Sequence, residues 1–166
     1  MPEKIEPPKT SPGSFESGRK AIDDCHAQSL RALEKLSSLS CLLVAARADA
    51  EARRLACEVI AHFAIVARCH HDEEERSVFP ALLKFGDGEI ARSVMRLQLD
   101  HERMARDWRE LEPQLIAVAE GQFWYDTDVI FEGAVVFGEL IRGHFALEDS
   151  LIGALVRNRC GRARPR

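Results

Sequence analysis

Apolar residues recur at intervals of three and four along most of the chain, which is the spacing of one face of an α-helix. Four segments show this pattern. The apolar positions of the first are Ala21, Ile22, Leu30, Leu33 and Leu36, and those of the second are Leu55, Val59, Phe63 and Val66. The third has Val94, Leu97, Met104, Trp108, Leu111 and Leu115, and the fourth has Val129, Ile130, Val136, Leu140, Ile141, Leu151, Ile152 and Leu155. No segment sustains a period of two between turn residues, so strands are not expected. The pattern therefore predicts an all-α fold, an antiparallel up-and-down four-helix bundle.

Residues that interrupt or cap helices lie between these segments. Pro80 is expected to bend or restart the second helix, because proline cannot continue the hydrogen-bond ladder. Asp87, between two glycines, can cap the third helix, and Gly121 is expected to end it. Asp126 or Thr127 can cap the fourth helix.

The ends of the chain differ in composition from the helical segments. Residues 1–17 are rich in Pro, Ser, Lys and Glu and are predicted to form a disordered tail. Residues 18–158 are predicted to form one domain, followed by a basic tail at residues 159–166. A solvated chain end is the favoured interpretation of that basic tail, and a polyanion-binding arm is the alternative.

Composition and charge narrow the class of protein. The chain has 166 residues, 46% of them hydrophobic and 30% charged, which are ordinary values for one globular domain. A net charge of −4 does not favour nucleic acid or an anionic membrane as the main partner, and no apolar run is long enough to span a membrane. Five scattered cysteines without a CxxC pair indicate neither a zinc knuckle nor a disulfide framework. The first residues also lack the apolar stretch of a signal peptide, so we expect a cytoplasmic protein.

Histidines and glutamates occur at fixed places within the apolar pattern. Each predicted helix carries a histidine inside its apolar stripe, and two helices carry a glutamate four residues after that histidine. Residues four apart lie on one helical face, about 40° out of line. The resulting candidate metal ligands are His26, His70, Glu74, His101, His144 and Glu148.

The second helix offers two such pairs, because its sequence includes HHDEEE. His70 with Glu74 is favoured as the inward pair, since Arg68 lies on the face of His71 and a charged arginine fits poorly beside an interior site. His71 and Glu75 would then lie about 100° further round the helix, at its flank or in solvent.

Metal binding explains the burial of these six histidines and glutamates better than an ordinary place in the core does. A single histidine in an apolar stripe is usually a core residue with a hydrogen bond. Two carboxylates buried without partners would cost several kcal/mol each, a cost that a divalent cation removes. Four imidazoles and two carboxylates suit iron, manganese or zinc better than copper(I), and six ligands are too many for one tetrahedral zinc ion. Two metal ions are therefore predicted.

The order of these residues resembles the hemerythrin-like family of HHE cation-binding domains. Its pattern has a histidine in the first helix, H-x-x-x-E-E-x-x-x-F-P in the second, a histidine near the start of the third and H-x-x-x-E in the fourth. The matching residues here are His26; His70, Glu74, Glu75, Phe79 and Pro80; His101 within Asp100-His101-Glu102; and His144 with Glu148. The resemblance implies a four-helix bundle with a non-haem di-iron centre. Its two iron ions would be bridged by a carboxylate and an oxo or hydroxo group, with zinc or manganese as substitutes.

The resemblance also implies the range of roles. These are binding or sensing of O2, iron storage or delivery, and response to oxidative or nitrosative stress, with a diatomic molecule or peroxide as ligand. Oxygen-carrying hemerythrins have a second histidine four residues after the first in the third helix, and end with a histidine and an aspartate. This chain has Ala105 and Glu148 at those positions. A site poorer in imidazole disfavours stable O2 carriage, so sensing, peroxide chemistry or iron handling is expected.

Two other function classes stay open. One is a di-iron oxidase, peroxidase or nitric-oxide-consuming enzyme on the same ligands, and the other is a metal-free helical interaction module. Binding is favoured over catalysis, because no dedicated nucleophile or phosphate loop is evident. Phe63 and Trp108 are expected in the core, where they would also wall the metal pocket, whereas His62 is expected at a flank or interface. The residues leave a homodimer or another protein partner open.

Overall fold

Helices make up most of the described chain. The computed structural model describes residues 12–45 and 48–162. Its elements are α1 (Pro12–Ala45), α2 (Ala50–Ala61), η1 (His62–Ala67), α3 (Arg68–Glu73), η2 (Glu74–Val78), α4 (Phe79–Phe85), α5 (Gly88–Glu120) and α6 (Thr127–Arg162), where η marks a π-helical segment. No strand occurs in these two ranges, which confirms the all-α prediction.

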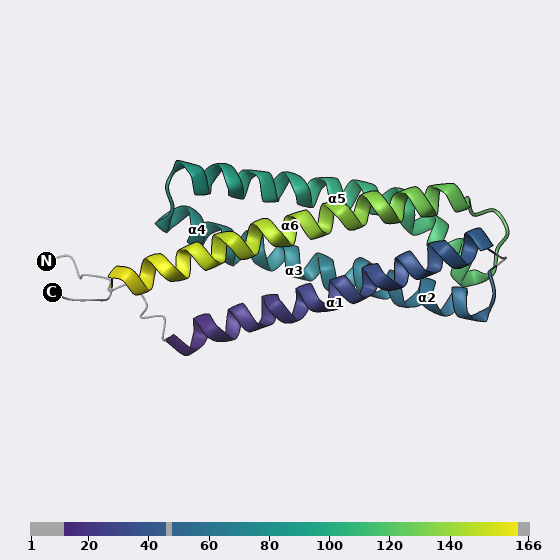
Figure 1. The fold of residues 1–166 in the computed structure, drawn as a ribbon, viewed down its shortest axis with the longest axis horizontal. Helices are drawn as coiled ribbons and strands as arrows, with labels where there is room; N and C mark the ends of the chain where they lie inside the picture. Colours follow the sequence, from purple (N-terminus) through teal and green to yellow (C-terminus); the bar gives the residue numbers. More distant parts are fainter. Residues whose placement is uncertain (1–11, 46–47, 163–166) are drawn as a thin grey trace, which may run out of the picture.

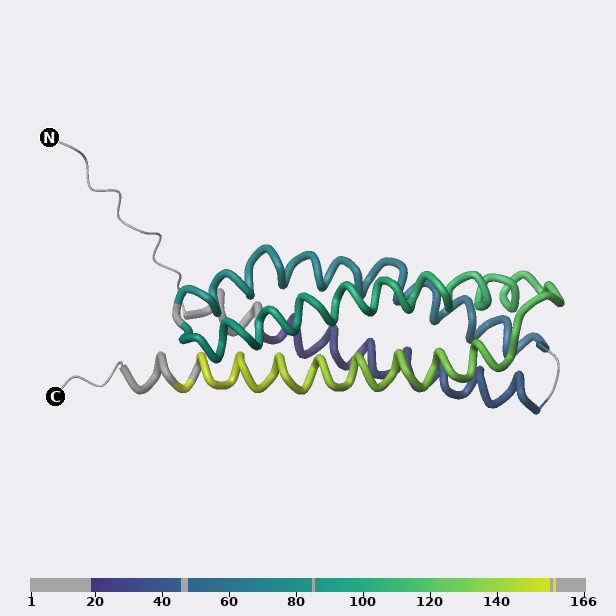
Figure 2. Tube along the Cα trace, turned by 90° about the horizontal axis from the view of Figure 1, so that it is seen from above, coloured from purple at the N-terminus to yellow at the C-terminus, as the bar shows by residue number. Residues whose placement is uncertain are grey.

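The elements form four long rods that pack lengthwise as a helical bundle (Figure 1). Helices α1, α5 and α6 are one rod each, and α2, η1, α3, η2 and α4 join end to end as the fourth. Helix α1 packs against α2 and α6, and α5 packs against the same two helices. Successive rods are connected at alternate ends of the bundle, and Figure 2 shows the rods from a second direction.

Local signals in the sequence set the helix ends. The Asp87 carboxylate accepts hydrogen bonds from two N–H groups in the first turn of α5, at 3.0 and 3.1 Å. At the start of α6, Asp126 and not Thr127 provides the cap, with two such bonds at 2.9 and 3.3 Å. Gly121 follows α5 in the left-handed region, with φ at 72°. Pro80 lies in the first turn of α4, directly after η2, so the predicted restart of the second helix is confirmed.

The hydrophobic core consists of two clusters with a polar layer between them. The smaller cluster contains Phe79, Leu82, Val94, Leu97, Leu151 and Leu155, and the larger one extends along all four rods. On α5, His101 lies between Leu97 of the smaller cluster and Met104 of the larger one. The rods thus carry their buried histidines and glutamates at a common level, with apolar packing on both sides.

The chain ends differ in part from the prediction. Helix α1 begins at Pro12, inside the stretch predicted to be a disordered tail (residues 1–17), and residues 1–11 lie outside the described part. Proline suits the first turn of a helix, because its missing N–H would have no partner there. Helix α6 continues to Arg162, so it includes the start of the predicted basic tail. The proposed domain limits stay a prediction. Within the described ranges, none of the helices has an apolar stretch that could cross a membrane.

Candidate metal centre

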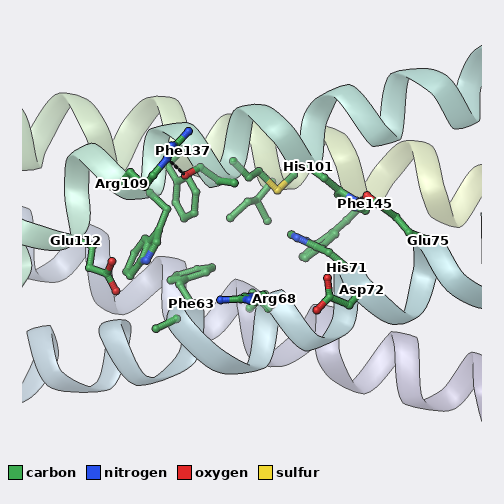
Figure 3. Close-up of a pocket in the computed structure, with 17 residues that line it drawn as sticks. Phe63, Arg68, His71, Asp72, Glu75, His101, Arg109, Glu112, Phe137 and Phe145 are labelled. Carbon is green, nitrogen blue, oxygen red and sulfur yellow. Dashed lines mark hydrogen bonds and ion pairs between the residues drawn. The ribbon is translucent and has the colours of Figure 1, made fainter.

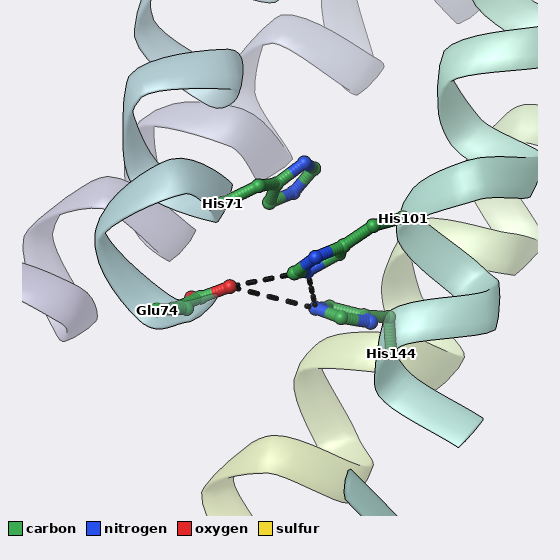
Figure 4. A group of neighbouring side chains, drawn as sticks. All are labelled: His71, Glu74, His101 and His144. Carbon is green, nitrogen blue, oxygen red and sulfur yellow. Dashed lines mark hydrogen bonds and ion pairs between the residues drawn. The ribbon is translucent and has the colours of Figure 1, made fainter. Parts of the chain in front are cut away.

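The six residues predicted as ligands converge on one buried region of the bundle. Within each of two groups of side chains, the ligand atoms lie within 4.8 Å of one another. The three-histidine group consists of His71, Glu74, His101 and His144, and the two-histidine group consists of His26, His70, Glu74 and Glu148. All six predicted residues are present, and His71 is added to them. Figure 4 shows the three-histidine group, in which Glu74 and His71 face two imidazoles from other rods.

Glu74 belongs to both groups and lies between them. Its Oε1 atom is 2.5 Å from Nε2 of His70, in the two-histidine group. Its Oε2 atom is 3.2 Å from Nε2 of His101 and 4.0 Å from Nε2 of His144, in the three-histidine group. The side chain is only 1% exposed. One carboxylate therefore presents one oxygen to each group, as a carboxylate that bridges two cations does.

Two further carboxylates contact imidazole rings from outside the groups. Oε1 of Glu75 lies 2.8 Å from Nδ1 of His101, and Oδ1 of Asp149 lies 3.5 Å from Nδ1 of His26. The Nε2 atoms of both rings face the groups; that of His26 is 3.1 Å from Oε2 of Glu148. Metal-binding histidines commonly donate the second ring N–H to a carboxylate, which fixes the tautomer and the ring orientation.

Several polar atoms in the groups are buried without a hydrogen-bond partner among the described residues. They are Nε2 of His70, Nδ1 of His144, Oε1 of Glu148 and both carboxylate oxygens of Glu74. The Glu74 oxygens lie close to imidazole nitrogens but are not aligned with them as acceptor and donor. Burying such atoms unpaired costs several kcal/mol, whereas a cation beside Glu74 satisfies the lone pairs of Glu74, His70 and Glu148. Of the His144 ring it is Nε2, not Nδ1, that faces Glu74. The donor set of five imidazoles and two carboxylates therefore fits divalent metal ions.

Close contacts shift the pKa values of the buried groups. Burial alone would raise the pKa of Glu74, but contacts with three imidazoles outweigh burial and lower that pKa. Burial would lower the pKa of His70, yet contacts with Cys25 and Glu74 raise it to about 10. The pKa of His101 is likewise raised, because contacts with Glu74 and Glu75 outweigh burial. In the metal-free site His70 therefore holds a proton at neutral pH that a metal ion has to displace.

Burial dominates the pKa of two other groups. It lowers the pKa of His71 to about 3, and the neighbouring His101 acts in the same direction. It raises the pKa of Glu148, against the contact with His26. His71 is therefore a neutral imidazole at physiological pH, which is the form that binds a metal ion.

A comparison with protein families agrees with this geometry. The family model described as the hemerythrin HHE cation binding domain matches residues 17–156. The chain belongs to this family. The match includes every residue of both groups. Comparisons with curated proteins and with solved structures gave no match.

In this HHE domain the position of His71 differs from the prediction. We expected a flank position because Arg68 shares its face, but the Arg68 side chain is exposed and His71 lies in the three-histidine group. The reason is that His70 and His71 are four and three residues before Glu74, and both of these positions border its face. His71 supplies an imidazole to a group whose α5 ligand is His101 alone. The two groups thus contain five histidines, one more than the four in the predicted ligand set.

A cavity of about 490 Å³ adjoins the three-histidine group of the HHE domain (Figure 3). His71 and His101 form part of its wall. The larger apolar residues of the wall are Phe63, Met104, Trp108, Phe137, Ile141 and Phe145. This confirms that Phe63 and Trp108 wall a pocket next to the groups. The cavity itself was not predicted, because it depends on how side chains from different rods meet.

The remaining histidine and the neighbouring cysteines lie outside both groups. Nε2 of His62 is 2.8 Å from the Ser29 hydroxyl, at the contact between η1 and α1, which agrees with the predicted flank position. Cys25 is buried beside His70, whereas Cys69 is exposed. Cys25 thus packs against a candidate ligand without joining either group.

Proposed function

We propose that this chain binds two iron ions, one in each group, with Glu74 as the shared bridging ligand. The observation that carries the proposal is that the two oxygens of Glu74 face different groups, at 2.5 and 3.2 Å from imidazole nitrogens. The other protein ligands would be His71, His101 and His144 for one ion, and His26, His70 and Glu148 for the second. Iron is proposed from the family resemblance, and manganese and zinc suit the same nitrogen and oxygen donors.

We also infer that the four rods form an antiparallel up-and-down bundle. Their connections at alternate ends support this arrangement (Figure 1). It lets all four rods contribute ligands at one level, between the two apolar clusters that exclude water.

The proposed ligand of the centre is O2, peroxide or nitric oxide, and the proposed role is sensing, stress response or iron handling. A bound iron pair supplies Fe(II)/Fe(III) redox chemistry and coordination positions beyond those of the protein donors. Two features of the three-histidine group favour metal binding: burial keeps His71 neutral, and Glu75 orients the ring of His101. The adjoining cavity gives a small molecule access to one side of the site.

Anaerobic addition of Fe(II) to metal-free protein tests the proposal. We expect two iron ions per chain and, after exposure to air, the near-ultraviolet absorption of a ferric di-iron site. Glu74→Gln keeps the side-chain size but removes the shared charge, so we expect at least roughly tenfold weaker binding of one or both ions. Glu73→Gln is the matched control, because Glu73 is exposed and paired with Arg76. One ion per wild-type chain, or equal loading of the two variants, would contradict a bridging Glu74.

A di-iron oxidase or peroxidase is the second candidate. The cavity beside His71 and His101 favours it, because an organic molecule could lie next to the centre. Many turnovers of peroxide or nitric oxide per iron pair would identify an enzyme, whereas a single stoichiometric reaction would identify a binding protein.

A further inference from the structure

The cavity beside the three-histidine group is far larger than a diatomic ligand requires. Its volume is about 490 Å³, whereas one water molecule takes up about 30 Å³ of the liquid. Cavities of about 300–1,000 Å³ are typical of sites for organic ligands. A molecule much larger than O2 or peroxide therefore has room against His71 and His101.

Flat rings form much of the cavity wall. The ring centroids of Phe63, Trp108 and Phe137 lie 5.1, 5.4 and 5.8 Å apart, which makes one aromatic cluster. On the side of the metal groups, His71 and His101 stack with centroids 4.1 Å apart and planes inclined by 15°. Aromatic faces and edges attract further rings in offset or edge-on contact, beyond the effect of burial alone. The wall thus favours an aromatic ligand.

Small side chains leave this space open. Ala64 of η1 and Ala105 of α5 line the cavity from two different rods. Neither side chain extends beyond Cβ, so the space beside both residues stays open for a ligand.

Charged side chains of both signs border the cavity. Arg68 and Asp72 line it from α3, and Arg109 and Glu112 line it from α5 (Figure 3). Within the described residues, none of these four takes part in an ion pair, although Arg109 donates a hydrogen bond to the Ala105 carbonyl. Glu75 of η2 also lines the cavity, but its carboxylate is paired with Nδ1 of His101. The charged groups without an ion pair are thus two positive and two negative, which gives no preference for the net charge of a ligand. Recognition therefore rests on the ring.

We propose that the cavity binds a small aromatic molecule of one or two rings, between the Phe63–Trp108–Phe137 cluster and the stacked His71 and His101. All of these walls are present in the metal-free protein, so binding is expected without metal as well. One consequence does rest on the proposed function: in the iron-loaded protein the bound ring lies next to the iron pair.

The test uses 4-fluorophenol as the probe, with the full chain both metal-free and iron-loaded. Calorimetric titration and 19F NMR of the probe measure binding to one saturable site. Ala105→Leu places a larger side chain in the cavity, and leucine keeps the helix because it is a good helix former. This change is expected to weaken binding of the probe about tenfold or more. Ala91→Leu is the matched control, because Ala91 is also exposed on α5 but does not line the cavity. Cyclohexanol, similar in size but not aromatic, is expected to bind roughly threefold or more weakly than the probe.

Each outcome bears on the proposal. Absence of saturable binding to the wild type, or equal affinity in the Ala105→Leu and Ala91→Leu variants, overturns the site. Equal binding of cyclohexanol overturns the aromatic class. Ala64→Leu fills the cavity from the opposite rod and replaces Ala105→Leu if that variant loses helix content. Probe binding without iron uptake refutes only the proposed function, and iron uptake without probe binding refutes only the cavity site.

Discussion

His71 and His62 lie in the same rod, but only His71 lies near Glu74. His71→Ala removes one donor from the three-histidine group, so we expect at least roughly tenfold weaker binding of one of two iron ions. His62→Ala removes the hydrogen bond with Ser29 and a ring contact with Phe63, both outside the two groups, and should leave both ions bound. Metal content after gel filtration at limiting free iron compares the two variants. Equal metal content would exclude His71 as a ligand.

Spacing in the sequence could identify most of the candidate residues but not the whole set. His26, His101 and His144 each lie in an apolar stripe, and each is buried. The choice between His70 and His71 could not be made correctly from spacing, since both precede Glu74 by about one turn. The doubled histidine was the available signal, and it indicates that both rings border the same glutamate.

The two π-helical segments act at the scale of the element. Segments η1 and η2 flank the six-residue helix α3, which carries both His70 and His71. Hydrogen bonds from residue i to i+5 widen a turn and change which side chains face inward, and such segments are frequent at functional sites. A period of 3.6 residues cannot reveal them. The helix ends were easier to predict, because Asp87 and Gly121 act through local chemistry alone.

Substitution of Gly121 tests how much the end of α5 depends on a glycine at this position. Its φ of 72° is unfavourable for any residue with a Cβ atom, and an added Cβ would lie 2.6 Å from the Arg53 guanidinium. Gly121→Ala should therefore lower the free energy of unfolding by about 1–2 kcal/mol. Gly143→Ala is the control, because it lies inside α6 with nothing within 4 Å of the added atom. That change should raise stability by about 0.5–1 kcal/mol. Urea unfolding of both variants measures the difference, and equal effects would contradict the local explanation.

For the whole molecule, the periodic pattern was sufficient to predict a helical bundle with its polar layer, because each amphipathic segment has one apolar face to bury. It was not sufficient to predict the cavity. That space is open because small residues on two rods, Ala64 and Ala105, line it. Packing between rods depends on their relative rotation, which the pattern of a single helix does not contain.

The metal-free and metal-loaded molecules should also differ in bound protons. The pKa of His70 is about 10 in the folded metal-free site, against about 6.5 in an unfolded chain. The protonated imidazole therefore stabilises the metal-free fold fully below about pH 6.5, and this contribution is lost as the pH rises through about 10. Only the neutral imidazole binds a metal ion, so the same proton opposes metal binding over this range.

Binding of Mn(II) near neutral pH should consequently release about one proton from His70, and His101, whose pKa is also raised, should add to the release. The apparent affinity should rise with pH between about 6.5 and 8.5, because the displaced proton competes less well at lower proton concentration. Calorimetric titrations in two buffers of different ionisation enthalpy measure the released protons directly. A binding enthalpy that is the same in both buffers would contradict this prediction. It would mean that these imidazoles are already neutral before the metal binds, and that their contacts with Glu74 do not keep them protonated.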